Sequence, residues 1–214
     1  MRIAQLFPRL IASAAAVLAL QASAADIRPG VEFDYLPKAM PTEPAGKIEV
    51  VEFFWYGCPH CNHLEPAVQA WAKTLPPEVA FRREHVLWNG RTDMDGHARL
   101  FVALKTMNLV NALTPKVFDA VHRDKIELRD PAVAVDWATK QGLNRAQFES
   151  AYNGFGTAAL LARAKQMSHD YDIDGVPTFV INGKYKTSPS KVGGGDQRFF
   201  EVINALIAKE KAAK

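Results

Sequence analysis

The two cysteines of this chain are the residues whose type and spacing point most directly to chemistry. Cys58 and Cys61 are the only cysteines among 214 residues, and Pro59 and His60 separate them. Two thiols at this spacing can close a disulfide and reopen it by exchange with a third thiol. The C-x-x-C pair therefore indicates redox chemistry first.

The pair lies where a predicted strand gives way to a predicted helix. Residues 47–55 are β-branched, aromatic and nearly continuous in apolarity, which favours a strand buried on both faces. Pro59 suits the first turn of a helix that begins beside Cys58. The apolar stripe of that helix consists of Leu64, Val68, Trp71 and Leu75.

A cysteine at a helix start gains reactivity from its position. Free backbone N–H groups and the positive end of the helix dipole stabilise an anion there, and the thiolate is the reactive form of cysteine. His60 adds a second source of positive charge or hydrogen bonding. Cys61, one turn further on, is expected to face the interior, which gives Cys58 as the attacking sulfur and Cys61 as the resolving sulfur.

Two other uses of the cysteines remain as alternatives. A permanent structural disulfide between Cys58 and Cys61 would close so short a loop that it would remove little entropy from the unfolded chain. A zinc site would draw on Cys58, Cys61, His60 and His63, but neighbours on one helical turn cannot easily surround a tetrahedral ion. A non-catalytic metal-binding module is therefore the alternative to redox exchange, and we expect no metal.

Glu52 is a carboxylate in the middle of the predicted strand that leads to Cys58. A buried carboxylate has a raised pKa, so a buried Glu52 could take or give the proton of Cys61 during exchange. In the alternative, strand alternation places Glu52 at an exposed edge, paired with Arg83 on the neighbouring strand. The pattern leaves both open.

The N-terminal segment predicts export. Residues 1–24 contain basic residues, an apolar run over residues 10–20 and the small-residue sequence Ala22-Ser23-Ala24, the signature of a cleaved signal peptide. The apolar run is shorter than the roughly 20 residues of a membrane-spanning helix, although an uncleaved anchor is the alternative. With 26 basic against 23 acidic residues, the composition does not indicate a nucleic-acid partner.

The rest of the chain divides into three parts: residues 25–90, residues 91–170 and residues 171–214. The first ends in a predicted strand over residues 79–88. The second carries only helical patterns, with predicted caps at Thr114-Pro115, at Asp130-Pro131 and at Asn144 with Gln147.

The third part begins with a predicted hairpin over residues 177–187, turning at Asn182-Gly183. A flexible glycine loop over residues 193–195 and a cap at Asp196 precede a closing helix over residues 197–208. This order predicts an α/β domain interrupted by an all-helical insertion.

Residues 52–61 (EFFWYGCPHC), followed by Gly175-Val176-Pro177-Thr178 and residues 182–185 (NGKY), resemble the DsbA family of periplasmic thiol:disulfide oxidoreductases. The resemblance covers essentially the whole chain after the signal segment. It implies a thioredoxin fold with an inserted all-helical domain and a cis peptide at Val176-Pro177.

The resemblance also implies a role for each matching residue. Cys58 corresponds to the nucleophile, Cys61 to the buried resolving cysteine and His60, beside Pro59, to the main tuner of redox power. Val176 and Pro177 correspond to the loop that faces the disulfide and binds substrate, and Glu52 to the buried acid. The family usually has lysine near Arg83, a departure in this chain.

The implied function is donation of the Cys58–Cys61 disulfide to unfolded or reduced exported proteins in the periplasm. A DsbB-type quinone-linked membrane oxidase would restore the disulfide, and a monomer without a separate cofactor is expected. The rival within redox chemistry is a disulfide isomerase or reductase that is kept reduced. No dimerisation domain of the isomerase kind is evident, and Pro59-His60 differs from the Gly-Pro pair of reducing thioredoxins.

Overall fold

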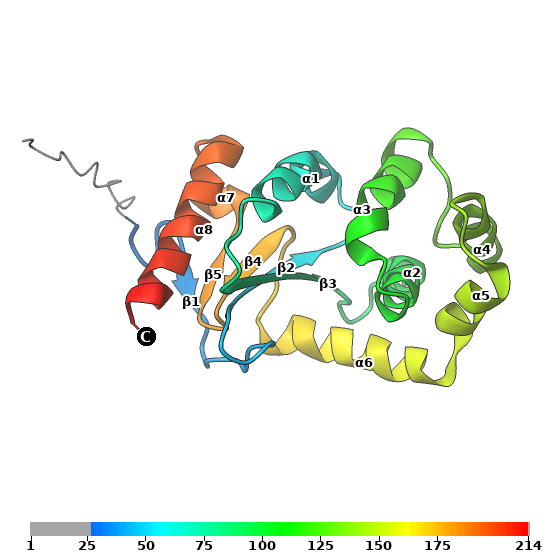
Figure 1. Cartoon of the computed structure of the whole chain (residues 1–214), viewed down its shortest axis with the longest axis horizontal. Helices are drawn as coiled ribbons and strands as arrows, with labels where there is room; N and C mark the ends of the chain where they lie inside the picture. The colour runs from blue at the N-terminus through cyan, green and yellow to red at the C-terminus, as the bar shows by residue number, and fades with distance from the viewer. Residues whose placement is uncertain (1–26, 214) are drawn as a thin grey trace, which may run out of the picture.

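The computed structural model describes residues 27–213, so the predicted signal peptide over residues 1–24 lies outside the described residues. Figure 1 shows a twisted sheet with helices on both sides and a group of helices beyond one end. The elements in chain order are β1 (Asp34–Tyr35), β2 (Ile48–Phe54), α1 (Pro59–Ala72), β3 (Val79–His85), η1 (Thr92–Met94), α2 (Asp95–Thr106), α3 (Val110–Phe118), η2 (Asp119–Arg123), α4 (Pro131–Lys140), α5 (Arg145–Asn153), α6 (Phe155–Asp170), β4 (Thr178–Ile181), β5 (Tyr185–Thr187), α7 (Pro189–Val192) and α8 (Gly195–Ala212).

Within the described residues, five strands form one mixed sheet in the order β1-β5-β4-β2-β3. β2 lies between a parallel neighbour, β3, and an antiparallel neighbour, β4. Every residue of β2 is buried, which confirms the prediction of a strand covered on both faces. β3 is shorter than the predicted 79–88, because its last paired residue, His85, lies opposite Phe54 at the end of β2.

The two faces of the sheet are covered by different helices. Val50 of β2 belongs to an apolar core with α1 and α8, whereas Val51 and Phe53 pack on the other face with residues of α6. Figure 1 shows α6 running along the side of the sheet away from α1 and α8. A third core lies among α2 to α5 and includes Phe54 and Tyr56. It connects the helical segment, which is the part of the chain between β3 and β4, to the end of β2.

The helical segment between β3 and β4 confirms two of the three predicted caps. Asp130 accepts from two backbone N–H groups at the start of α4, and Asn144 accepts from the N–H of Gln147 at the start of α5. The cap predicted at Thr114-Pro115 is wrong, because α3 begins at Val110 and includes both residues. Thr114 is buried and its hydroxyl contacts that of Tyr56, so its side chain makes a tertiary contact in place of a cap.

The C-terminal part contains the predicted hairpin. β4 and β5 meet at a turn in which Asn182 and Gly183 have φ values of 50° and 62°, the pattern of a type I′ turn. The prediction that Asp196 caps the last helix is wrong, since α8 begins at Gly195 after Gly194. Asp196 lies in the first turn instead, where its carboxylate interacts favourably with the helix dipole.

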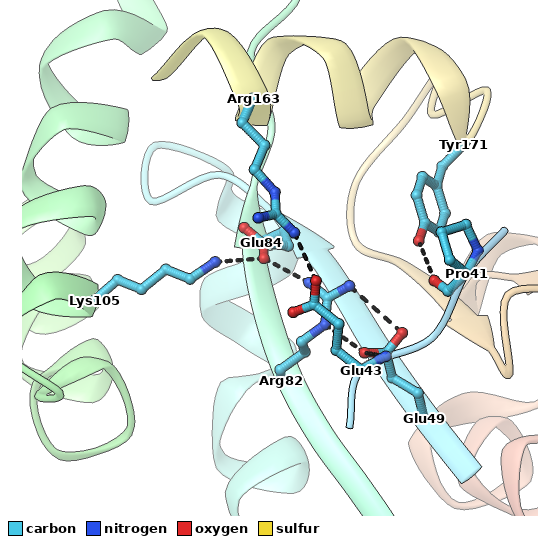
Figure 2. A network of polar contacts seen from close by, with 8 residues as sticks. All are labelled: Pro41, Glu43, Glu49, Arg82, Glu84, Lys105, Arg163 and Tyr171. Carbon is cyan, nitrogen blue, oxygen red and sulfur yellow. Dashed lines mark hydrogen bonds and ion pairs between the residues drawn. The ribbon is translucent and has the colours of Figure 1, made fainter. Parts of the chain in front are cut away.

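Charged side chains connect the sheet to the helical segment (Figure 2). The guanidinium of Arg82 on β3 binds Glu49 of β2 at 2.7 Å and Glu84 of its own strand at 2.5 Å. Lys105 of α2 also binds Glu84, at 2.5 Å. Because Glu49 and Glu84 are buried, these ion pairs compensate charges that would otherwise be costly.

The same network reaches the segment before β2 and helix α6. Glu43 donates its backbone N–H to the Glu49 carboxylate at 3.0 Å, and its own carboxylate accepts from Arg163 of α6 at 2.8 Å. The sheet, α2, α6 and the entry to β2 are therefore held by one set of charges (Figure 2).

No helix within residues 27–213 is both long enough and apolar enough to cross a membrane.

Replacing Arg82 tests how much the network stabilises the fold. Arg82→Met leaves Glu49 buried without its guanidinium partner, so we expect the free energy of unfolding to fall by about 3 kcal/mol. Arg145→Met is the matched control, because Arg145 pairs with Asp136 and Glu149 at the exposed surface, so its loss should lower the free energy of unfolding far less. Urea unfolding of the oxidised protein gives both values, and equal losses would contradict the prediction.

Candidate active site

Cys58 occupies the N-cap of α1, as its place in the sequence predicts. Its backbone is extended, with φ −82° and ψ 118°, and Pro59 is the first helical residue. The backbone N–H of Cys61 points at the Cys58 sulfur at 3.5 Å. The start of the helix thus directs free donors at this sulfur.

Both cysteines are free thiols, and both are shielded from solvent. Cys61 is fully buried, as predicted, but Cys58 is also only 6% exposed. The cover comes from the far end of the chain, where the Cys58 thiol donates to the backbone carbonyl of Val176 at 3.4 Å. The Val176-Pro177 peptide bond is cis, as the family resemblance implied.

The surroundings of the two sulfurs have opposite effects on their acidity. Hydrogen bonding from the Cys61 thiol, with support from the backbone N–H groups of Cys61 and His60 and from the His60 side chain, lowers the pKa of Cys58 to about 6. Burial raises the pKa of Cys61 well above its ordinary value, and the neighbouring Cys58 raises it further. At neutral pH the pair therefore carries its negative charge on Cys58.

A groove of about 720 Å³ lies beside the cysteines. His60, His63 and Leu64 of α1 line it together with Val176 and Pro177. His60 and His63 are exposed, as expected for His63 from the sequence. The structure thus brings the C-x-x-C segment and the Val176-Pro177 segment to one surface feature, large enough for several side chains of a bound peptide.

Glu52 is buried, and it is also paired with Arg83, so each sequence alternative was right in one respect. The side chain is 1% exposed, and Arg83 Nε lies 2.7 Å from its Oε2 atom. Burial raises the pKa of Glu52, although Arg83 opposes that rise. Its other oxygen, Oε1, has no hydrogen-bond partner within residues 27–213.

Glu65 is a neighbour of this site that the sequence analysis missed. It is buried on α1, where Arg83 binds it at 2.9 Å, so two carboxylates share one guanidinium. Burial raises the pKa of Glu65 to about 7, with Arg83 opposing and Glu52 adding to the rise. The available signal was its position, one helical turn after Cys61 and therefore on the same face.

The chain is similar to proteins of one family along most of its length. The family model of the DSBA-like thioredoxin domain matches residues 49–206. The thiol:disulfide interchange protein DsbA of Azotobacter vinelandii is 38% identical over 192 residues, which cover 90% of this chain and 88% of that protein. DsbA of Burkholderia cepacia is 40% identical over 171 residues, which cover 79% and 80% of the two chains.

Solved structures give the same result. The crystal structure of Pseudomonas aeruginosa DsbA matches with a TM-score of 0.81 at 36% identity, over 88% of this chain and 96% of that one. The oxidoreductase NmDsbA1 from N. meningitidis matches with a TM-score of 0.76 at 30% identity, over 88% and 96% of the two chains.

The low pKa of Cys58 predicts how the stability of the reduced protein depends on pH. Folding lowers this pKa from about 9 to about 6, so the thiolate favours the folded state. The free energy of unfolding of the reduced protein should therefore rise as the pH increases from 6 to 8, by at most about 1.4 kcal/mol per pH unit, and this gain should be lost below pH 6. Urea unfolding across this range measures it.

The oxidised protein is the control, because it has no thiol to titrate. The difference in stability between the two forms should begin to rise near pH 6, the pKa of Cys58 in the folded protein, and His60→Ala should move that onset to higher pH by removing one source of stabilisation. His63→Ala, an exposed histidine one turn further along the helix, should not move it. A difference that is flat between pH 5 and pH 8 would contradict the prediction.

Proposed function

Because this chain belongs to the DsbA family and is a thiol:disulfide oxidoreductase, we propose that Cys58 and Cys61 form the disulfide that it donates to newly exported proteins. Its architecture is the DsbA-like thioredoxin fold with a helical insertion. The observation that carries the proposal is the opposite shift of the two cysteine pKa values at the start of α1. Because of this asymmetry, Cys58 is suited both to form a mixed disulfide and to leave it as a thiolate.

The first step of the proposed reaction forms a mixed disulfide. A substrate thiolate attacks Cys58 Sγ, the bond between Cys58 and Cys61 breaks, and its electron pair goes to Cys61 Sγ. A buried thiolate is unstable at Cys61, so that sulfur takes up a proton. Glu52 is the proposed donor, because burial keeps its carboxyl protonated to higher pH and its charge is near enough to influence the Cys61 thiol.

The second step releases the oxidised product. A second substrate thiolate attacks the substrate sulfur of the mixed disulfide, and Cys58 leaves as a thiolate. The leaving group is good because the start of α1 stabilises that anion. The substrate has lost two electrons to the enzyme, which a DsbB-type quinone-linked membrane oxidase would then remove.

Substrate binding is assigned to Val176 and Pro177 together with the groove beside them. The carbonyl of Val176 accepts from Cys58 while that sulfur is protonated. A mixed disulfide has no proton on that sulfur, so the carbonyl becomes free to accept an N–H group from an extended substrate backbone. The groove along α1 then receives neighbouring substrate side chains.

The organisation and location of the protein are proposed on the same basis. Residues 1–24 act as a cleaved signal peptide that directs the chain to the periplasm. Residues 25–90 and residues 171–214 form the thioredoxin-like domain, residues 91–170 form the inserted helical domain, and the protein works as a monomer without a cofactor.

Redox equilibration with glutathione, combined with one variant, tests the function. We expect a strongly oxidising potential, because stabilising the Cys58 thiolate stabilises the reduced form. We also expect Cys58→Ala to lose all oxidation of a reduced, unfolded substrate protein, while Lys140→Ala at the exposed end of α4 keeps it. A potential as reducing as that of thioredoxin would favour a reductase or isomerase, and an active Cys58→Ala would favour a non-catalytic role for the pair.

Replacing the buried acid tests the proton transfer to Cys61. Glu52→Gln keeps the size of the side chain but cannot supply a proton, so the first step should slow by about tenfold or more in single-turnover experiments. Glu65→Gln is the matched control, because it also removes a carboxyl group from Arg83 but leaves Glu52 in place. Equal rates for the two variants would argue against Glu52 as the donor.

A further inference from the structure

The turn that leads into Cys58 contains a central peptide group whose orientation is not fixed by the residues of the turn themselves. The backbone N–H of Cys58 donates to the carbonyl of Trp55 at 2.9 Å, which closes a four-residue turn with Tyr56 and Gly57 in the middle. The peptide between Tyr56 and Gly57 is the central peptide of that turn. β-turns of types I and II differ mainly in the orientation of this peptide.

Gly57 does not prevent the central peptide from rotating. A glycine at the third position of a turn adopts positive φ without cost, and type II turns require it there. In this structure Gly57 does not have a positive φ, so the turn does not use that freedom here. Its lack of a side chain is needed for a different reason, since a Cβ atom would lie 2.4 Å from the ring of Trp55.

His122 of η2 holds the carbonyl of this central peptide. Its Nε2 atom lies 2.8 Å from the carbonyl oxygen of Tyr56. A carbonyl oxygen only accepts, so Nε2 carries the hydrogen and donates. η2 has π-helical hydrogen bonding, a rare widening of a helix that occurs often at functional sites.

The backbone N–H of Tyr56 is held by a second histidine. It donates to Nε2 of His85, at the end of β3, at 3.4 Å. His85 Nδ1 lies 2.9 Å from the carbonyl of Val86 and must donate there, so its Nε2 atom is free to accept. The β-sheet therefore fixes one side of the Tyr56 backbone, and the helical segment fixes the other.

We infer that His122 is a positioning residue for disulfide exchange, because its hydrogen bond to the Tyr56 carbonyl fixes the turn that places Cys58 at the N-cap of α1. The inference rests on the proposed role of Cys58 as the nucleophile. It gives the helical segment an indirect part in the reaction, through the Tyr56 carbonyl. If the central peptide rotates, Cys58 loses the backbone conformation in which its sulfur accepts from the N–H of Cys61.

Two substitutions at position 122 separate the hydrogen bond from the volume of the side chain. His122→Leu keeps an apolar side chain against Phe118, whose ring centroid lies 5.9 Å from that of His122, but removes the donor. His122→Gln supplies an amide N–H in its place. In the leucine variant we expect the rate of disulfide exchange with a reduced, cysteine-containing peptide to fall roughly fivefold, the usual worth of one hydrogen bond.

The titration of Cys58 is the readout that a merely structural role would not change. In His122→Leu the pKa of Cys58, followed by thiolate absorbance or alkylation rate, should rise by about half a unit or more, and the redox potential should become less oxidising. His122→Gln should restore both. The control is Thr114→Val, which removes the contact between the hydroxyls of Thr114 and Tyr56 but leaves the Tyr56 carbonyl bound, and it should leave the Cys58 titration unchanged.

Two results would overturn the inference. One is a wild-type Cys58 pKa and exchange rate in His122→Leu; the other is an equal loss in His122→Gln and His122→Leu. Failure of the proposed function is distinguishable, because it would appear as retained oxidation in Cys58→Ala whatever residue occupies position 122.

Discussion

The first turn of an α-helix has more hydrogen-bond donors than its own backbone can use, and in this protein those donors are directed at the sulfur of Cys58. Every other feature of the site either preserves that arrangement or exploits it. The Cys61 thiol adds a further donor, and the burial of Cys61 keeps the negative charge from moving to the second sulfur. In the proposed reaction this anion is the group that leaves in the second step, so one local interaction would set both the acidity of Cys58 and the direction of electron transfer.

The sheet and the helical segment supply the surroundings that this interaction requires. β2 ends next to the turn that carries Cys58, and its parallel register with β3 sets Arg83 between two buried carboxylates. Two carboxylates with one guanidinium make a site that can hold a proton, and under the proposed function that proton passes to Cys61, whose pKa Glu52 influences. The helical segment contributes more than cover, since His122 and Thr114 both contact Tyr56 at the entry to the active-site turn.

Sequence reasoning succeeded where the deciding interactions are local. The buried strand, the helix start at Cys58 and the hairpin at Asn182-Gly183 depend on neighbours within a few residues, and all three are present. It failed for the cap at Thr114, because a capping residue is also tolerated inside a helix, where Thr114 contacts Tyr56. It failed for the cap at Asp196 because α8 begins one residue earlier, at Gly195. The burial of Glu52 and its pairing with Arg83 depend on strand register, and the contact of His122 depends on how the helical segment packs against the sheet. Neither is encoded in a short stretch of sequence.

The position of the helical segment between β3 and β4 has a consequence for folding. β4, which pairs with β2, follows the whole segment in the chain, and the carbonyl that contacts Cys58 lies 118 residues further along the chain. Contacts of such high sequence separation slow the folding reaction. A nascent or truncated chain therefore contains the cysteine pair without the surface that covers it, and disulfide exchange of the native kind reports that the chain has been completed.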